Sequence, residues 1–289
     1  MQEIKGTGVA LVTPFNEDMS IDYTGLKNII NHVIEGGVDY LVIMGTTGES
    51  VVLSKEERSE VLTYCKEINN GRVPVVLGLG GNNTLQVLED IKSVNLTGVD
   101  AILSVSPYYN KPTQEGIYNH YKLLANQSSL PIILYNVPGR TSSNITAQTT
   151  LRLAYDFPNI VAVKEASGDM QQIMDIIKNR PSNFLVISGD DALTLPIIHM
   201  GGDGVISVIG QSFPKEYSQM VNYALENDKV NANKLHYFLY DYYQPLYADG
   251  NPAGIKALLA LLGFCKPMVR PPLVKSRKAT INHLKDLLN

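Results

Sequence analysis

The chain has 289 residues, of which 44% are hydrophobic and 18% charged, and its formal net charge at pH 7 is −4. This composition is typical of a globular protein with a large core, and the length suits either two ordinary domains or one (β/α)8 barrel of about 250 residues. No basic block is longer than 275–278, so we expect neither nucleic acid nor an anionic membrane as a partner.

The N-terminus, the apolar runs and the cysteines bear on the compartment of the protein. Residues 1–6 lack the basic and apolar regions of a secretory signal. The longest clean apolar run, 257–262, is far too short to span a bilayer. Cys65 and Cys265 stand alone, without the spacing of a zinc site or a disulfide scaffold. We therefore expect a cytoplasmic protein with no membrane span.

Short apolar runs that are rich in Val, Ile or Leu recur along the chain, as expected for buried parallel strands. The segments between them repeat apolar residues at spacings of three and four, which is typical of amphipathic helices. Eight strand–helix units in succession predict a closed (β/α)8 TIM barrel, with an open doubly wound sheet as the alternative. The expected strands are Gly8–Thr13, Tyr40–Met44, Val73–Leu79, Ala101–Ser106, Ile132–Asn136, Ile160–Lys164, Leu185–Ser188 and Val205–Ile209.

Polar residues mark the starts of two helices within the barrel pattern. Ser54 and Glu57 have the spacing of a capping box. The pair Asp190-Asp191 follows the seventh strand and is expected to cap the next helix. Because the barrel pattern ends near Leu225, we expect a barrel domain over residues 1–225, which carries the active site, and a helical domain over residues 226–289.

The C-terminal helical appendage has its own character. Helices are expected over Val230–Tyr243, Pro252–Gly263 and Pro272–Leu288, separated by Gly and Pro residues. Tyrosine favours interfaces, because one end of the ring is apolar and the other can stay wet. We expect this domain to shield an edge or to build an oligomer, since it is rich in tyrosines: Tyr237, Tyr240, Tyr242, Tyr243 and Tyr247.

The stretch 160–166 is the most informative for chemistry. It reads as a strand buried on both faces that ends in Lys164. In barrels of parallel strands, ligands bind at the carboxyl ends of the strands. A lysine there is partly desolvated, which favours the neutral amine, and a neutral amine can form a Schiff base with a carbonyl group. On this strand alone, an ordinary strand-end charge would be the simpler interpretation.

Residues at the ends of other strands should converge on the same pocket. The turn Gly45–Ser50 follows the second strand, and its Thr46 and Thr47 offer hydroxyls and amides that can hold a carboxylate, although Gly-Thr turns are common. After the seventh and eighth strands, Gly189 and the run that begins at Ile206 can supply backbone groups or shape.

The fourth and fifth strands are followed by aromatic and cationic residues. Strand alternation directs one of Tyr108 and Tyr109 toward the pocket and the other away. Tyr135 places a phenol at the barrel mouth, and Arg140 suits bidentate capture of a carboxylate. The simpler alternatives are that Tyr135 is a core residue whose hydroxyl is hydrogen-bonded and that Arg140 forms a surface salt bridge.

Several chemistries lack their signatures. The five histidines show no HxH or HExxH spacing, so we expect no metal site. The segment 78–83 lacks the last glycine of a dinucleotide fingerprint, and no phosphate-binding P-loop motif occurs. One lysine, tyrosines, paired threonines and an arginine remain, a set suited to carbanion chemistry through an enamine without a cofactor.

At these residues the chain resembles the dihydrodipicolinate synthase/N-acetylneuraminate lyase family of class I, pyruvate-dependent aldolases. The resemblance covers essentially the whole chain, and the order of its motifs is highly specific. It implies a Schiff base of Lys164 with pyruvate, whose enamine attacks an aldehyde. The motifs are G-T-T-G-E (45–49), P-Y-Y-N-K-P-T-Q-E-G (107–116), Y-N-V-P-G-R-T (135–141), V-K-E-A-S-G (163–168) and S-G-D-D (188–191).

The resemblance also implies roles for the other site residues. Tyr135 acts as acid and base through a relay with Thr46 and with Tyr109, which the neighbouring subunit contributes. Thr47, beside Thr46, binds the pyruvate carboxylate. Arg140 binds the carboxylate of L-aspartate 4-semialdehyde, giving 4-hydroxy-tetrahydrodipicolinate in diaminopimelate and lysine biosynthesis.

The resemblance also implies that Gly189 and the backbone near Ile206 line the pyruvate pocket. Because a neighbouring subunit contributes Tyr109, it implies at least a dimer, and a tetramer of two dimers is also expected. The alternative within the family is a lyase for N-acetylneuraminate or a 2-keto-3-deoxy sugar acid, for which Arg140 has no obvious role. A second alternative is a non-catalytic barrel that binds 2-oxo acids.

Family members inhibited by lysine bind it at the dimer interface, and Ser50, Asn82 and Tyr108 match that possible allosteric site. Where inhibited enzymes tend to have histidines and a glutamate, this chain has Lys55, Arg58 and Gln86. Two added cations and one lost carboxylate disfavour a cationic ligand. We therefore expect weak or absent inhibition by lysine.

Overall fold

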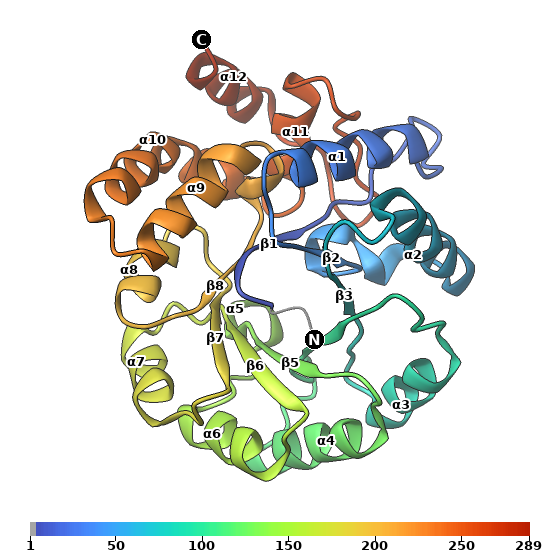
Figure 1. The fold of residues 1–289 in the computed structure, drawn as a ribbon. Coiled ribbons are helices and arrows are strands. Elements are labelled where there is room, and N and C mark those ends of the chain that lie inside the picture. The colour runs from blue at the N-terminus through green and yellow to red at the C-terminus, as the bar shows by residue number, and fades with distance from the viewer. Residues whose placement is uncertain (1–3) are drawn as a thin grey trace.

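Eight parallel strands close into a barrel in the computed structural model, which describes residues 4–289 (Figure 1). Each strand pairs with its neighbours in the chain, and β8 pairs with β1. The predicted (β/α)8 barrel is confirmed, and the open sheet is wrong. Residues 1–3, which contribute to the expectation about a secretory signal, lie outside the described part. The strands are β1 (Gly6–Ala10), β2 (Tyr40–Ile43), β3 (Val75–Gly78), β4 (Ala101–Val105), β5 (Ile132–Asn136), β6 (Ile160–Glu165), β7 (Leu185–Ser188) and β8 (Gly204–Ser207).

Two glycines face each other where the first and last strands close the ring. Gly6 pairs with Gly204, and both have positive φ angles, 76° and 149°. A Cβ atom on Gly204 would lie 2.1 Å from the carbonyl oxygen of Gly6. Only glycine allows this approach of the two backbones, so the closure of the barrel depends on this pair.

The first and last strands differ from their expected bounds. Gly8–Thr13 was expected for β1, but beyond Ala10 the backbone N–H of Val12 donates to the side chain of Gln211 instead of to a strand. Val205–Ile209 was expected for β8, but Ile209 already lies in the 3-10 turn η3 (Ile209–Gln211). Its backbone N–H donates to the Asp191 carboxylate, 2.9 Å away, so the strand ends earlier.

A helix follows almost every strand and covers the outside of the barrel (Figure 1). Side-chain caps start most of these helices, and the predicted capping box of Ser54 and Glu57 is confirmed. The helices are α1 (Tyr23–Glu35), α2 (Lys55–Asn69), α3 (Thr84–Ser93), α4 (Gln114–Gln127), α5 (Pro138–Thr141), α6 (Ala147–Asp156), α7 (Met170–Asn179), α8 (Thr194–His199) and α9 (Pro214–Leu225), and the 3-10 turns η1 (Thr46–Gly48) and η2 (Ser50–Val52) follow β2.

The cap expected from Asp190-Asp191 is wrong, because α8 begins after Leu193 and no side chain caps it. The Asp190 carboxylate accepts from the backbone N–H groups of Ala192 and Leu193, in the turn that leads into α8. Asp191 is buried instead, and it accepts from the backbone N–H groups at the end of β8. It therefore fixes a neighbouring loop and does not cap a helix.

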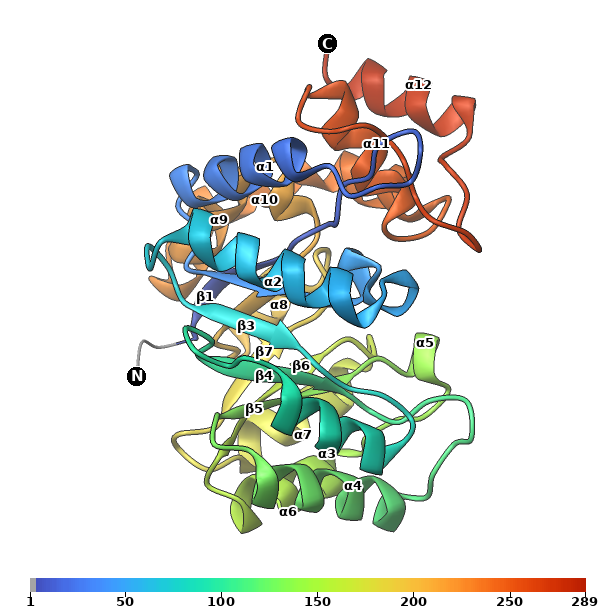
Figure 2. The same ribbon diagram turned by 90° about the vertical axis from the view of Figure 1, so that its right-hand side faces the viewer.

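Three helices follow the barrel: α10 (Lys229–Tyr247), α11 (Ala253–Leu261) and α12 (Lys278–Leu287). Helix α12 begins at Lys278 and not at Pro272, because the backbone N–H of the extended residue Arg277 donates to Asp249, 2.9 Å away. Helix α10 packs along α9, and α11 contacts α10, α12 and η3. Figure 2 shows α11 and α12 stacked beyond α1 at one side of the barrel.

Hydrophobic side chains fill the barrel and the layer around it. The interior cluster includes Ile133, Tyr135, Ala162, Ile187 and Ile206, which alternate with outward residues of the same strands. The largest outer cluster joins residues of α1, α2 and α9 to residues of α10 and α11. The C-terminal helices therefore share a core with the barrel.

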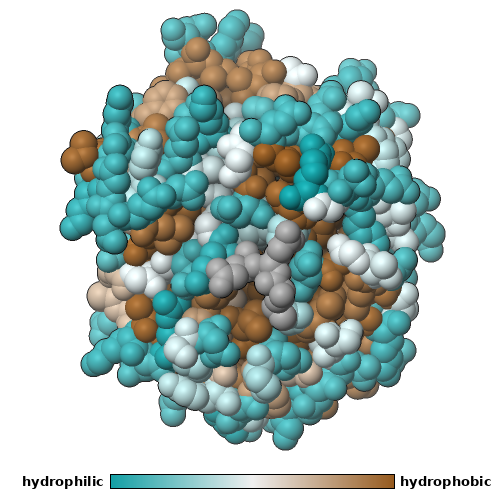
Figure 3. All heavy atoms as spheres, in the orientation of Figure 1, coloured by the Kyte–Doolittle hydropathy of each residue, from teal (hydrophilic) through white to brown (hydrophobic). Residues whose placement is uncertain are grey.

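The amino ends of the strands face the viewer in Figure 3. Hydrophilic residues cover much of the rim of this face, and hydrophobic residues show in separate areas. The carboxyl ends of the strands, where the site residues lie, are on the opposite face. None of the helices within residues 4–289 combines the length and the apolar character that a bilayer span requires.

Candidate active site

Lys164 lies near the carboxyl end of β6, and its side chain is only 6% exposed. In the β5–β6 register it is paired with Tyr135, and its Nζ atom lies 4.4 Å from the centroid of the Tyr135 ring. Both side chains come from inward positions of neighbouring strands. The structure thus brings the predicted amine and the predicted phenol together at the mouth of the barrel.

Gly189 and Ile206 complete the inner wall around this lysine. A Cβ atom on Gly189 would lie 3.1 Å from Cε of Lys164 and 2.6 Å from Cβ of Ala166. Any larger residue at this position would displace the lysine side chain, so the glycine keeps room for it. Ile206, on β8, belongs to the same interior cluster as Tyr135.

The turn η1 presents Thr46 to solvent and buries Thr47. The hydroxyl of Thr47 accepts from Nδ2 of Asn251 over 2.9 Å, so its own hydrogen remains free to donate to a ligand. The carbonyl of Gly48, in the same turn, accepts from the hydroxyl of Thr13 over 2.7 Å. The turn is therefore held from two sides while its threonines stay available.

Arg140 and Tyr109 extend outward from the rim. Arg140 lies on the short helix α5 and is exposed, and no carboxylate of residues 4–289 pairs with its guanidinium, which disfavours the surface salt-bridge alternative. Tyr109 is 86% exposed and has a φ angle of 74°, in the left-handed region that non-glycine residues rarely adopt. The rest of the chain hardly covers the Tyr109 side chain, whereas Tyr108 is half-buried.

A network of amides lies directly behind the Lys164–Tyr135 pair. Nδ2 of Asn136 donates to both carboxylate oxygens of Glu165 over 3.0 Å, and Nε2 of Gln172 donates to Oε2 over 2.9 Å. The backbone N–H of Ser167 donates to Oε1 over 2.8 Å. Burial raises the pKa of Glu165, and these bonds oppose that rise. This network was not predicted from the sequence, although Asn136 and Glu165 each directly follow a predicted site residue.

The residues of the possible allosteric site lie on three consecutive loops after β2, β3 and β4. Ser50, Asn82 and Tyr108 are all half-buried. The side chain of Gln86 donates to Asp90 over 2.9 Å, and Lys55 lies 3.8 Å from the same carboxylate. Lys55 and Gln86, which replace residues typical of the lysine-inhibited enzymes, thus both contact Asp90.

Within residues 4–289, no group of three or more His, Cys, Asp or Glu side chains could hold a metal ion. The buried histidine with the clearest perturbation is His120, whose pKa is lowered to about 4 by burial. Its Nδ1 lies 2.9 Å from the hydroxyl of Thr84, the first residue of α3.

The fold and these strand-end residues define an enzyme of the (β/α)8 barrel class. The model of the dihydrodipicolinate synthetase family matches residues 3–289, and the chain belongs to this family. It is 53% identical to the 4-hydroxy-tetrahydrodipicolinate synthase of Flavobacterium psychrophilum, over 98% of this chain and 97% of that protein. It is 51% identical to the enzyme of the same name from Parabacteroides distasonis, over 99% and 96%.

A solved structure agrees with these relatives. The chloride-inhibited dihydrodipicolinate synthase from Acinetobacter baumannii, crystallised in complex with pyruvate, superimposes with a TM-score of 0.95 at 37% identity. The match covers 99% of this chain and 98% of that one. The family resemblance expected from the motifs is therefore confirmed.

Proposed function

We propose that the protein condenses pyruvate with L-aspartate 4-semialdehyde to give 4-hydroxy-tetrahydrodipicolinate, the committed step of diaminopimelate and lysine biosynthesis. The observation that carries the proposal is the buried Lys164, whose Nζ atom lies over the ring of Tyr135 at the strand ends. Relatives about half identical along the whole chain bear the name of this activity. They support the synthase and give no support to the sugar-acid lyase or the non-catalytic barrel.

The proposed chemistry begins with attack of the Lys164 amine on the keto carbon of pyruvate, followed by loss of water to form an iminium. Loss of a proton from the methyl group gives the enamine, which attacks the aldehyde carbon of the second substrate. The amino group of that substrate then attacks the imine carbon and releases the lysine as the ring closes. The iminium is the electron sink, so the reaction requires no metal and no other cofactor.

Each remaining site residue takes a role that suits its position. Tyr135 transfers protons to and from the carbinolamine oxygen, with Thr46 and a neighbouring subunit's Tyr109 as the relay. The buried Thr47 donates to the pyruvate carboxylate. The exposed, unpaired Arg140 holds the carboxylate of the aldehyde substrate in a bidentate contact. Gly189 and Ile206 shape the pocket for the small methyl group.

An oligomer follows from the role given to Tyr109. Exposed hydrophobic side chains lie in the connections that follow three consecutive strands: Val51 in η2, Leu85 at the start of α3 and Tyr109 in the loop after β4. Contiguous exposed apolar groups of this kind mark protein interfaces. We propose a dimer through these loops. Exposed aromatic residues of α10 (Tyr237, Phe238 and Tyr240) offer a second contact that would join two dimers into a homotetramer of the cytoplasm.

Turnover of pyruvate with aspartate semialdehyde, coupled to the next, NADPH-dependent reductase, tests the activity. Borohydride with pyruvate should label Lys164, and Lys164→Ala should abolish both labelling and turnover. Arg140→Ala should lower kcat/KM for the aldehyde by about 100-fold or more and leave labelling intact, because only the second substrate loses its partner. Labelling without turnover would contradict the choice of aldehyde, and no labelling would contradict the Schiff base.

Weak inhibition by lysine is a separate expectation. Lys55 and Gln86 already engage Asp90, so this carboxylate is not free to pair with a lysine ligand at the possible allosteric site. Steady-state rates at increasing lysine should change little up to millimolar concentrations. Gln86→Glu should increase the inhibition, whereas strong inhibition of the unmodified enzyme at sub-millimolar lysine would contradict the expectation.

A further inference from the structure

Glu49 directly follows the turn that carries Thr46 and Thr47. It has a φ angle of 53°, in the left-handed region, and its side chain is buried. Its Oε1 atom contacts Nζ of Lys256, and its Oε2 atom accepts from the backbone N–H of Arg270 over 3.0 Å. Both partners lie more than two hundred residues further along the chain. Glu49, the residue that directly follows the turn, is therefore held by the C-terminal segment.

Lys256 is the only charged residue of α11, and its side chain is 0% exposed. Besides Glu49, Nζ donates to the carbonyl of Met268 over 2.8 Å and lies 4.1 Å from the centroid of the Phe15 ring. Burial lowers the pKa of Lys256, and the carboxylate of Glu49 opposes this effect. The ammonium group is thus fully enclosed by fixed partners from three parts of the chain.

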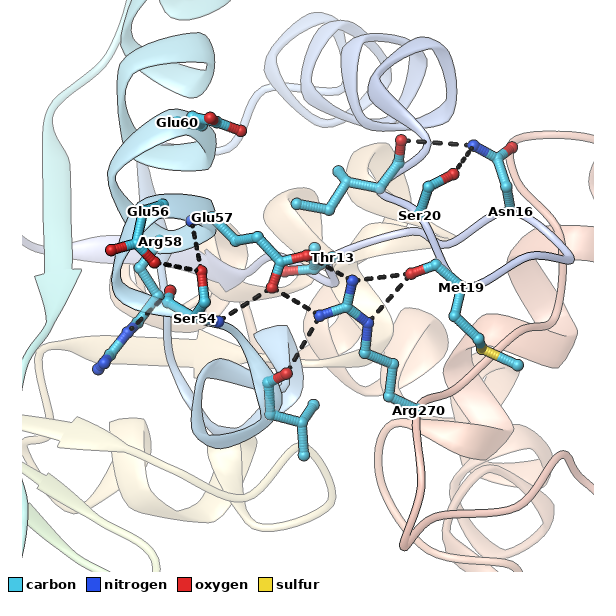
Figure 4. Close-up of polar contacts among 12 residues, drawn as sticks. Thr13, Asn16, Met19, Ser20, Ser54, Glu56, Glu57, Arg58, Glu60 and Arg270 are labelled. Atoms are coloured by element: carbon cyan, nitrogen blue, oxygen red, sulfur yellow. Dashed lines mark hydrogen bonds and ion pairs between the residues drawn. The ribbon is translucent and has the colours of Figure 1, made fainter.

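Arg270 extends the same attachment along the loop after β2. Its guanidinium donates to both carboxylate oxygens of Glu57, over 2.6 and 2.7 Å, and to the carbonyls of Met19 and Val52. Figure 4 shows this side chain between Glu57 and Met19. Together with Glu49, the loop is fastened on both sides of η2, so its backbone has little freedom to shift.

A buried ion pair is a weak source of stability, since apolar residues of similar volume often stabilise a fold as well or better. What such a pair supplies here is a fixed position for the backbone that carries the threonines. Hydrogen-bond donors lower a barrier only when they are aimed in advance at the place where the ligand will lie. A shift of the turn by a fraction of an ångström would misplace them.

We propose that the Glu49–Lys256 pair is a positioning device that aims the Thr46–Thr47 turn at the carboxylate of the 2-oxo acid. The pair touches no substrate and acts only through the turn. The inference rests on the proposed function, because it assumes that this turn binds pyruvate. It assigns a function in the reaction to two residues of the loop and the appendage that lie outside the strand-end set.

The test uses the double variant Glu49→Gln, Lys256→Met, which removes both charges and keeps similar volumes. The pyruvate concentration that gives half-maximal borohydride labelling of Lys164 should rise about 10-fold or more. KM for the aldehyde and kcat at saturating pyruvate should change less than about threefold, since Arg140 and Lys164 are undisturbed. A merely structural role would lower the amount of active enzyme and leave both Michaelis constants unchanged.

A matched control removes another ion pair, Arg180 with Asp203, by Arg180→Met with Asp203→Asn. This pair lies at the amino ends of β7 and β8, and its loss should leave half-maximal labelling unchanged. If the first double variant does not fold, Glu49→Asp keeps the charge and shortens the reach, and should still raise the half-maximal pyruvate concentration about threefold. An unchanged value in the folded variant overturns the inference, whereas no labelling of the unmodified enzyme overturns the proposed function.

Discussion

The two walls of the site are held in different ways. Behind Lys164 and Tyr135, the network of Asn136, Glu165 and Gln172 lies wholly within β5, β6 and the start of α7, at separations of 29 and 7 residues. The turn with Thr46 and Thr47 is held instead by Asn251, Lys256 and Arg270, at separations of 204 to 221 residues. One wall belongs to the barrel itself, and the other depends on the appendage.

The two walls differ in how they are held because they serve different steps of the proposed reaction. The lysine proposed to form the Schiff base sits on a strand whose ladder hydrogen bonds and local amide network fix it as the barrel forms. The turn proposed to bind the pyruvate carboxylate lies on a loop, where a backbone is freer, and long-range contacts from the C-terminal segment compensate for that freedom. Damage to the first wall should therefore affect stability and kcat, and damage to the second should affect mainly the binding of pyruvate.

The largest effect is expected for Glu165→Ala, which breaks the first wall. The change removes the charged acceptor that Asn136, Gln172 and the backbone N–H of Ser167 share, and leaves the two amides only the side-chain oxygen of Asn144. This loss should cost about 3–5 kcal/mol of unfolding free energy and lower Tm by about 10 °C. Because Glu165 and Asn136 adjoin Lys164 and Tyr135, kcat should fall about 10-fold or more, with a smaller change in KM for pyruvate. Thermal unfolding and steady-state kinetics measure both.

Asp175→Ala is the control for this prediction, because Asp175 lies on the exposed side of the same helix α7. It should leave Tm and kcat almost unchanged. If Glu165→Ala raised KM for pyruvate while kcat and Tm stayed constant, the division of tasks between the two walls would be wrong.

A smaller effect is expected for Glu57, which anchors the loop of the second wall to Arg270. The hydrogen bonds from Arg270 lower the pKa of Glu57 to about 2, from an ordinary 4.5. Since the folded-state pKa is the lower one, this interaction stabilises the fold above pH 4.5, and the stabilisation is lost as the pH falls toward 2. With 28% of the side chain exposed, we expect it to contribute about 1–2 kcal/mol.

Urea unfolding at pH 6 and at pH 3 measures this contribution. Glu57→Gln should be less stable than the unmodified protein at pH 6 by that amount, and the difference should shrink at pH 3. Glu60→Gln, on the same helix, is the control: its carboxylate accepts from the Tyr23 hydroxyl over 3.1 Å and not from Arg270, so the difference should be smaller than for Glu57→Gln. Equal differences at both pH values would contradict the assignment to Glu57.

The smallest effect is expected for Asn251→Ala, which removes one neutral hydrogen bond from Thr47. KM for pyruvate should rise about 3–10-fold, and kcat and Tm should change little, because such a bond contributes about 1 kcal/mol. Asn231→Ala, in a residue that bonds to Asp228 at the start of α10, is the control in the same appendage. A fall in kcat without a change in KM for pyruvate would show instead that Asn251 supports the wall of Lys164 and Tyr135.

The sequence allowed the barrel and the strand-end residues to be predicted because both follow from local patterns. Apolar runs mark the strands, and the last residues of each run and those that follow it lie at the mouth, which places Lys164, Tyr135 and Arg140 there. The predicted bounds of β1 and β8 were wrong, since the true bounds depend on the side chains of Gln211 and Asp191, which replace ladder partners.

The contacts of the appendage were not predictable in the same way. No periodic pattern links Asn251 to Thr47 or Lys256 to Glu49 over two hundred residues. One signal was present: a single lysine interrupts the otherwise apolar run Ala253–Leu261, and a charge on a buried helix requires a partner. The tyrosines of α10, which were expected as a group to favour an interface, fall into two sets: Tyr242 and Tyr243 are buried in the core, whereas Tyr237 and Tyr240 are exposed.

The long separation between the turn and its anchors has a consequence for synthesis. A chain emerging from the ribosome exposes β2 early, and all eight strands are complete once Ser207 has been made. The anchors at Asn251, Lys256 and Arg270 follow only near the end of translation. Since domains generally fold from the N-terminus during synthesis, we expect a nascent barrel to exist before its turn is fixed. The turn proposed to bind pyruvate is then fixed last, by α11 and the segments on either side of it.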